Sequence, residues 1–386
     1  MRLSQRMARL GTETAFEVLV RARALEARGK HVVHLEIGEP DFDTPAHITE
    51  AAVRALKGGA THYSPAAGIP ELRAAVAEDT ARRRGVRATP EMVVVTPGAK
   101  PIMFFVIMAL VDEGDEVLYP NPGFPIYESM IRYVGGNAVP VRLLEDKGFT
   151  LDVDQLVSRV SPRTRLIILN YPHNPTGGTI PESGLRAIAD AAARHGVPVL
   201  SDEIYSRILY DGSHVSIAAL PGMEPLAIIL DGFSKTYAMT GWRLGYGVMP
   251  APMAQVVAKL QVNSTSCTAT FSQMAAVAAL TEDQSPVDRM VAEFRRRRDV
   301  IVDGLRQVPG FQCARPKGAF YVFPNITRTG HSSRSLADML LDEAGVACLS
   351  GTAFGEFGEG HLRFSYANSL ENIEEALRRI KALIAS

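Results

Sequence analysis

Lys235 is a candidate nucleophile of this sequence. It follows an apolar run, residues 226–230, that is typical of a buried strand. Open α/β sheets bind their ligands just beyond the carboxyl ends of such strands. An amine that is buried there near other cations has a lowered pKa, so it can form a Schiff base with an aldehyde. Ser234 and Arg243 supply a hydroxyl group and a guanidinium group nearby, and both groups suit a bound phosphate.

The segment from Ser234 to Arg243 resembles a motif of the class I and II aminotransferases. It reads Ser-Lys-Thr-Tyr-Ala-Met-Thr-Gly-Trp-Arg, and the family pattern is Ser-Lys-x-x-x-Met-Thr-Gly-x-Arg. The resemblance extends from about Leu10 to the C-terminus. It implies the fold type I architecture of the aspartate aminotransferase-like group. That α/β fold has a large domain, with a mostly parallel seven-stranded sheet covered by helices, and a smaller α+β domain. In that family the lysine holds pyridoxal 5′-phosphate as a Schiff base.

Two other apolar runs end at residues that match the family. The run 165–170 leads into Pro-His-Asn-Pro-Thr-Gly, and the resemblance implies that Asn174 in this turn reaches the phenolic oxygen of the cofactor. The run 197–200 leads to Asp202 and Tyr205. By resemblance, Asp202 lies at the pyridine nitrogen and Tyr205 at the phenolic oxygen. A carboxylate beside that nitrogen keeps it protonated, and a protonated ring draws off the electrons left when the Cα–H bond breaks.

Small residues and an aromatic residue complete the expected cofactor site. The strand 93–96 is followed by Gly98 and Ala99, which open an apolar helix. Free N–H groups at a helix start bind phosphate, so both residues are cofactor-binding candidates. Phe124 follows the strand 116–119 and matches the aromatic residue that stacks on the pyridine ring in the family. Phenylalanine stacks but cannot donate a hydrogen bond.

The expected substrate-binding residues are Gly38, Lys100, Asn174 and Arg363. In the family, the glycine of Gly-Glu-Pro-Asp-Phe lets backbone approach the substrate carboxylate, because it has no Cβ. Arg363 matches the arginine that grips the α-carboxylate. Lys100 stands where acidic-substrate members hold the distal carboxylate, which favours aspartate or glutamate. Glu36 shares the face of Gly38 by strand alternation and is expected to oppose Lys100, so a neutral or basic substrate stays open.

Tyr63 bears on the assembly of the protein. It lies in a loop, residues 62–73, that leads into a helix. In the family the matching tyrosine crosses to the neighbouring subunit and binds its cofactor phosphate. The resemblance therefore implies a homodimer with shared active sites.

The length and composition bound the remaining possibilities. A chain of 386 residues without a low-complexity linker predicts two closely packed domains. We expect an N-terminal arm with part of the small domain (1–45), a large cofactor-binding domain (46–284) and a small C-terminal domain (285–386). The net charge of −1 gives no indication of a nucleic-acid or membrane partner. The run Arg295–Arg298 lies on a predicted helix, 286–308, and is expected to be a solvated face.

The cysteines and the apolar runs indicate the compartment. Cys267, Cys313 and Cys348 are far apart and show no Cys-x-x-Cys spacing, so we expect reduced core residues and no metal site. The N-terminus lacks the apolar core of a secretory signal, and no apolar run reaches about 18 residues. These features predict a cytoplasmic protein.

The sequence thus predicts a pyridoxal-phosphate-dependent aminotransferase that moves an amino group between an L-amino acid and a 2-oxo acid. Lys235 would hold the cofactor and move the proton between the substrate Cα and the cofactor. A lyase or cyclase of a specialised pathway, acting at Cβ or Cγ, would show nearly the same motifs and remains the alternative. A cofactor-binding regulator would need a DNA-binding module, for which the chain has no spare length before Gly38.

Overall fold

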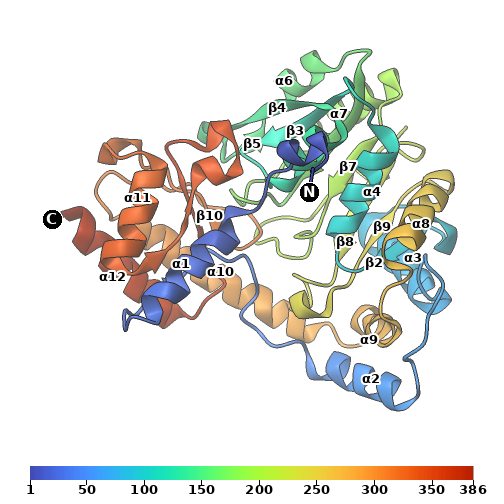
Figure 1. Cartoon of the computed structure of the whole chain (residues 1–386), viewed down its shortest axis with the longest axis horizontal. Coiled ribbons are helices and arrows are strands. Elements are labelled where there is room, and N and C mark those ends of the chain that lie inside the picture. The colour runs from blue at the N-terminus through green and yellow to red at the C-terminus, as the bar shows by residue number, and fades with distance from the viewer. Residues whose placement is uncertain (386) are drawn as a thin grey trace.

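The computed structural model describes residues 1–385, which form a larger and a smaller part side by side (Figure 1). The larger part is built on a sheet that has eight strands within these residues, in the order β2-β9-β8-β7-β6-β3-β4-β5. Its strands are β2 (Val93–Thr96), β3 (Glu116–Asn121), β4 (Asn137–Leu144), β5 (Thr150–Leu151), β6 (Thr164–Asn170), β7 (Val199–Asp202), β8 (Ala227–Gly232) and β9 (Gly245–Val248).

The sheet is mostly parallel, as expected. Strand β9 runs antiparallel to both β2 and β8, which confirms the orientation implied for residues 244–249. The neighbours from β8 to β4 pair in parallel. The two-residue strand β5 adds an antiparallel edge to the expected seven strands.

Helices cover both faces of this sheet (Figure 1). They are α2 (Ala46–Lys57), α3 (Pro70–Arg84), α4 (Lys100–Leu110), α5 (Ile126–Val134), α6 (Val153–Arg159), α7 (Glu182–His195), α8 (Ala251–Thr265) and α9 (Thr270–Thr281). Successive residues of β8 alternate between the two cores: Ile228 and Leu230 pack with α4 and α8, whereas Ile229 packs with α2 and α9. Because both faces are covered, the central strands read as continuous apolar runs.

The smaller part contains a three-stranded antiparallel sheet, counted within residues 1–385, with the order β10-β13-β12. Its strands are β10 (Tyr321–Val322), β12 (Leu349–Ser350) and β13 (Leu362–Ser365). A separate parallel pair joins β1 (Val33–His34) to β11 (Val346–Ala347). The helices here are α1 (Thr14–Glu26), α10 (Ser285–Leu305), α11 (Ser333–Met339) and α12 (Leu370–Ala385). The β1–β11 pair brings the N-terminal segment into the C-terminal part of the molecule.

Short turns of helix complete the described chain. The 3-10 turns are η1 (Gln5–Arg9), η2 (Pro90–Met92), η3 (Glu145–Lys147), η4 (Ile217–Ala219), η5 (Thr240–Trp242), η6 (Thr327–Thr329), η8 (Gly351–Phe354) and η9 (Glu356–Gly358), and η7 (Leu340–Ala344) is π-helical. Cys267, Cys313 and Cys348 are free, and the last two are buried.

Neither a membrane span nor a metal-binding cluster is found in the described part of the chain. No helix of residues 1–385 is long and apolar enough to cross a bilayer. The same residues contain no group of three or more His, Cys, Asp or Glu that could hold a metal ion.

The arginine run of α10 is not a uniformly solvated face, so that expectation was wrong for half of the run. Arg297 and Arg298 are buried, with exposures of 6% and 4%. The Arg297 guanidinium binds Asp41 at 2.6 Å, and that of Arg298 binds Asp211 at 3.2 Å. Helical periodicity turns these two residues toward the core, while the first two stay exposed. Their acidic partners lie far away in sequence, which is why the pattern of the run alone did not reveal them.

Candidate active site

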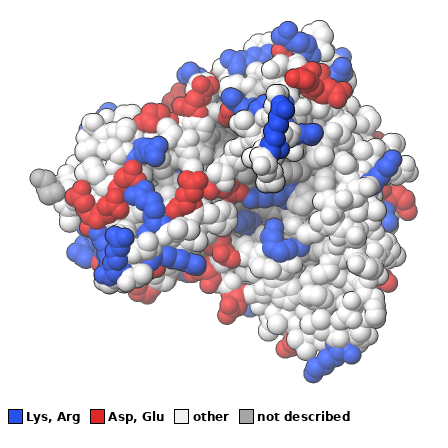
Figure 2. All heavy atoms as spheres, in the orientation of Figure 1, with Lys and Arg blue, Asp and Glu red and all other residues white. Residues whose placement is uncertain are grey.

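A cavity of about 520 Å³ lies at the carboxyl ends of β6, β7 and β8, where the larger part faces β10 and β13. Figure 2 shows the surface hollowed between the two parts, with basic side chains inside the hollow. Ligand sites of open α/β sheets occupy this position. Most of the residues predicted from the sequence line it, namely Gly38, Ala99, Lys100, Phe124, Asn174, Asp202, Tyr205, Ser234, Lys235, Arg243 and Arg363.

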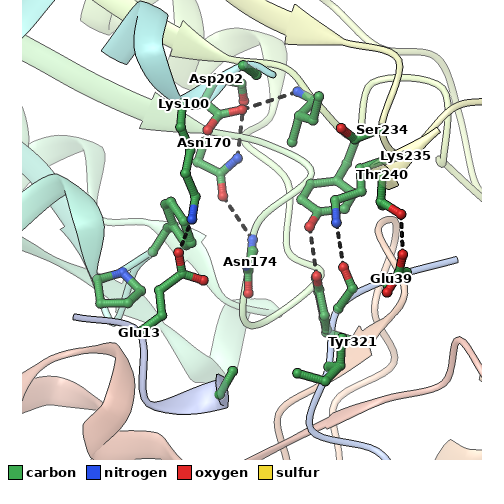
Figure 3. Close-up of a pocket in the computed structure, with 18 of the residues that line it drawn as sticks. Glu13, Glu39, Lys100, Asn170, Asn174, Asp202, Ser234, Lys235, Thr240 and Tyr321 are labelled. Atoms are coloured by element: carbon green, nitrogen blue, oxygen red, sulfur yellow. Dashed lines mark hydrogen bonds and ion pairs between the residues drawn. The ribbon is translucent and has the colours of Figure 1, made fainter. Parts of the chain in front are cut away.

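The amine of Lys235 lies enclosed in this cavity, although the residue as a whole is half-buried. Its Nζ donates a hydrogen bond to the backbone oxygen of Gly38 (Figure 3). Loss of hydration lowers the pKa of Lys235 to about 8, and the positive charge of Arg363 acts in the same direction. A larger fraction of the amine is therefore unprotonated near neutral pH than for an ordinary lysine, and the unprotonated amine is the form that reacts with an aldehyde.

Asp202 ends β7 and is held by two donors. The Tyr127 hydroxyl donates to its Oδ2 at 2.5 Å, and the Ile204 N–H donates to its Oδ1 at 3.2 Å. Burial raises the pKa of Asp202 to about 7, although the bond from Tyr127 acts against this rise. The carboxyl group is therefore poised to share a proton with a basic atom inside the cavity.

Asn170 connects the ends of β6 and β7. Its amide Nδ2 donates to the backbone oxygen of Asp202 at 3.1 Å, and its Oδ1 accepts from the backbone N–H of Asn174 at 2.9 Å (Figure 3). These two bonds fix Asn174 relative to Asp202. Sequence reasoning missed Asn170, although a polar residue at the end of a buried strand is a recognisable signal.

Arg363 lies in β13 and is 4% exposed. Its Nη2 donates to the backbone oxygen of Glu36, and its Nη1 donates to Asn174 Oδ1 at 3.2 Å. Its Nε is buried without a hydrogen-bond partner among the described residues. The guanidinium also lies 4.5 Å from the ring centre of Tyr321. A buried guanidinium with a spare donor suits a carboxylate ligand, which would satisfy that donor.

Position 38 requires a glycine, because its backbone packs closely against Tyr321 of the smaller part. A Cβ added at Gly38 would overlap the hydroxyl of Tyr321. That hydroxyl also lies 2.7 Å from the Tyr205 hydroxyl, so the two phenols share a hydrogen bond. Sequence reasoning identified Gly38 and Tyr205 but missed Tyr321, which sits between them, because an aromatic residue in an apolar run reads as core.

One corner of the cavity is built like a phosphate site. Gly98 is not among the residues that line the cavity, but it packs behind this corner: its φ is +84°, and a Cβ there would overlap the guanidinium of Arg243. That guanidinium donates from Nη1 to the Thr240 backbone oxygen at 2.8 Å. Ala99, at the N-terminus of α4, and Ser234 line the same cavity. A guanidinium, a hydroxyl and a helix N-terminus together fit a phosphate dianion.

Lys100 and Phe124 stand together at the side of the cavity that the N-terminal segment borders. The Lys100 Nζ lies 5.2 Å from the ring centre of Phe124 and forms an ion pair with Glu13 (Figure 3). Glu36 is not the opposing carboxylate, so that expectation was wrong. It is fully buried outside the cavity, where it binds His34 Nδ1 at 2.8 Å. Strand pairing covers only Val33 and His34, and alternation places Glu36 on the side of His34.

Tyr63 does not line the cavity of its own chain, and it is 91% exposed.

Some residues that line the cavity could not be recognised as site residues from the sequence. Glu39 accepts a hydrogen bond from the Thr240 hydroxyl, and Glu13 comes from the start of α1 (Figure 3). Charged and hydroxyl residues at such positions are usually solvated, and only the fold brings them to the cavity.

Comparisons with known proteins agree with this geometry. The family profile described as "Aminotransferase class I and II" matches residues 30–380. The "Probable aspartate/prephenate aminotransferase" of Aquifex aeolicus is 41% identical, over 98% of each chain. The "Aromatic-amino-acid aminotransferase 2" of Thermococcus litoralis is 40% identical, over 100% of this chain and 98% of its own. The structure of an aspartate aminotransferase from Thermus thermophilus with maleate superimposes with a TM-score of 0.95, at 39% identity over 99% of this chain and 100% of that chain.

Proposed function

The chain belongs to the class I and II aminotransferases and is a transaminating enzyme, and we propose that it moves an amino group between an L-amino acid and a 2-oxo acid with pyridoxal 5′-phosphate bound at Lys235. The relatives support transamination rather than the lyase or cyclase alternative. The observation that carries the proposal is the enclosed Lys235 amine, which lines one cavity with Asp202 and Arg363.

The residues of the cavity fit the cofactor. Arg243, Ser234 and the N-terminus of α4 would hold its phosphate, and Phe124 would cover one face of its ring. When bound, the cofactor supplies an aldehyde carbon and an electron-accepting ring. Asp202 would hold a proton at the ring nitrogen, because its raised pKa near 7 matches that of a weakly basic nitrogen.

Lys235 and Arg363 would have different roles toward the substrate: Arg363 would bind it, and Lys235 would transfer a proton. Arg363 would grip the α-carboxylate with its fork, and its unpartnered Nε supports this role. With the carboxylate fixed, the substrate Cα stays within the cavity that the Lys235 amine lines. An amine with a pKa of about 8 is partly unprotonated near neutral pH, so the Lys235 amine could accept the proton from Cα and, once protonated, donate it to the aldehyde-derived carbon of the cofactor.

The function is tested by following labelled nitrogen. The enzyme loaded with pyridoxal phosphate is incubated with a ¹⁵N-labelled amino acid and an unlabelled 2-oxo acid that differs in its carbon chain. We expect the label to appear in the amino acid made from the 2-oxo acid, with one new amino acid formed for each one consumed. Mass spectrometry measures the label. Release of the label as ammonia, without a labelled product, would contradict transamination and support the lyase alternative.

We further propose the domain division expected from the sequence, with residues 46–284 as the cofactor-binding domain and 285–386, joined by part of 1–45, as the small domain. The cores support this division. Val33 and Leu35 share a cluster with Phe294, Ile301 and the other buried residues of the small part.

The proposal includes a homodimer in which Tyr63 serves the site of the partner subunit. Its exposure of 91% and its absence from the lining of its own cavity support this role. Exposed apolar side chains on α2, α8 and α9 also support burial against another copy, namely Val53, Leu56, Val262 and Met274.

Mixing two defective variants tests the shared site. Tyr63→Ala and Lys235→Ala are each expected to have low activity as pure dimers. In a mixed dimer, one site carries both changes and the other carries neither, so refolding the two together should restore about a quarter of the wild-type activity. Refolding each variant alone is the control. If the mixture is no more active than the sum of its parts, Tyr63 does not act across the dimer.

A further inference from the structure

We propose that Glu13 determines substrate specificity by neutralising Lys100, so that the enzyme prefers amino acids with uncharged side chains to aspartate and glutamate. The inference rests on the proposed function, because it concerns the side-chain end of the same cavity. It assigns a role to a residue that the fold, and not a sequence motif, brings to the site.

The N-terminal segment crosses the cavity between the two parts of the molecule. On the large part, η1 packs against α5, and the Gly11 N–H donates to Ser129 Oγ at 2.8 Å. On the small part, Arg21 of α1 pairs with Asp338, and Ala22 packs in a cluster with Leu341. Figure 1 shows η1 against the large part and α1 against the small part. The short stretch between them carries Glu13 into the lining of the cavity.

Glu13 and Lys100 form an ion pair inside this opening. Their side chains are 19% and 46% exposed, so the carboxylate is the more enclosed partner. The Lys100 ammonium is also held near the Phe124 ring. Burial is the main influence on the pKa of Lys235, and the Glu13 charge opposes it by raising that pKa. The negative charge of Glu13 therefore acts on Lys235 as well as on Lys100.

The Glu13–Lys100 ion pair determines which charges a substrate side chain encounters in the cavity. A substrate whose α-carboxylate is bound by Arg363 directs its side chain to another part of the cavity. A second carboxylate would have to displace Glu13 from Lys100, and it would be repelled by Glu13 until it did so. A cationic side chain would compete with Lys100 for the same carboxylate and would face the released ammonium. A neutral side chain leaves the pair intact.

The rest of the lining supports a neutral side chain. Apolar residues also line the cavity, among them Phe16, Ile37, Leu349, Ala353 and Phe354. Burying an apolar side chain against such groups is favourable, and it requires no change in the charges around it.

The test compares two substrates in two matched variants. Glu13→Gln removes the charge at nearly constant shape, and Glu17→Gln makes the same change at an exposed position of α1 that does not line the cavity. The measured quantity is the ratio of kcat/KM for aspartate to kcat/KM for leucine. We expect the wild type and Glu17→Gln to prefer leucine. Glu13→Gln should raise the ratio about tenfold, equivalent to about 1.4 kcal/mol, mostly through a lower KM for aspartate.

A second change shows whether Lys100 is the cation that Glu13 masks. In the double variant Glu13→Gln/Lys100→Met, the gain for aspartate should disappear, because no cation remains to bind the second carboxylate. Leucine activity in each variant reports intact folding and catalysis. A wild-type preference for aspartate over leucine, an unchanged ratio in Glu13→Gln, or a gain that persists without Lys100 would overturn the inference. If the wild type transaminates no amino acid at all, the proposed function itself fails, which is a different result.

Discussion

Replacement of Lys235 by alanine is expected to lower the rate of amino transfer by at least about 10³-fold, since one side chain supplies both the amine that holds the cofactor and the proton carrier. Among the described residues that line the cavity, Lys100 carries the other amine, but it is paired with Glu13, and Arg363 carries a guanidinium that does not form a Schiff base. The measurement is kcat at saturating concentrations of the amino acid and the 2-oxo acid, with the cofactor added in excess.

Two further variants separate the chemistry of this amine from its charge. Lys235→Arg keeps a cation in the cavity but cannot give up its proton, so we expect it to be about as inactive as the alanine variant. Lys147→Ala removes an exposed lysine of η3 and should leave kcat unchanged. Activity of Lys235→Ala within about tenfold of the wild type would contradict the assignment, because general acid–base catalysis alone contributes more than that.

Replacement of Asp202 by asparagine is expected to lower kcat by at least about 10²-fold while the cofactor still binds. Asparagine has the shape of aspartate: its Oδ1 can still accept from the Ile204 N–H, and its Nδ2 would donate to the Tyr127 hydroxyl oxygen in place of the bond that Tyr127 now donates. It cannot carry the negative charge that would stabilise a protonated ring nitrogen. The measurements are kcat and the Kd for pyridoxal phosphate, and the prediction is a loss in kcat with a much smaller change in Kd.

The Tyr127→Phe variant is the control for the environment of Asp202. The hydroxyl of Tyr127 lowers the pKa of Asp202 by donating to its carboxylate, so its removal should raise that pKa further. A carboxyl group with a higher pKa is ionised only at higher pH, and the acidic limb of the pH–rate profile should therefore move to higher pH. If Asp202→Asn keeps kcat within about threefold of the wild type, Asp202 does not sustain the charge on the ring.

The short apolar runs predicted the centre of the fold because burial on both faces leaves a clear pattern. Strands β2, β3, β6, β7, β8 and β9 fall where such runs occur, and their carboxyl ends carry Asn170, Asp202 and the segment that leads to Lys235. Strand β4 is different, since it contains Pro140 and is half-buried along most of its length. Its sequence therefore resembles a loop, and it was not predicted.

A site residue could be predicted from the sequence where it lies in one short motif together with the residues that surround it in the folded site. Lys235 and Arg243 are of this kind, and the structure brings both to the cavity. Ion pairs between residues that are distant in the sequence could not be predicted in this way. Glu13 and Lys100 are 87 positions apart, and no local pattern links them. Sequence alternation instead suggested Glu36, but the carboxylate of Glu36 is buried outside the cavity and binds His34.

The central claim is that this chain transfers an amino group through Lys235, and the half-reaction tests it most directly. The wild type and Lys235→Ala, each loaded with pyridoxal phosphate, are mixed with excess amino acid in the absence of any 2-oxo acid. The wild type should release one equivalent of 2-oxo acid per active site in a single burst and then stop, and Lys235→Ala should show no burst on the same timescale. An equal burst from Lys235→Ala, or continuous release of 2-oxo acid with ammonia by the wild type, would contradict the account.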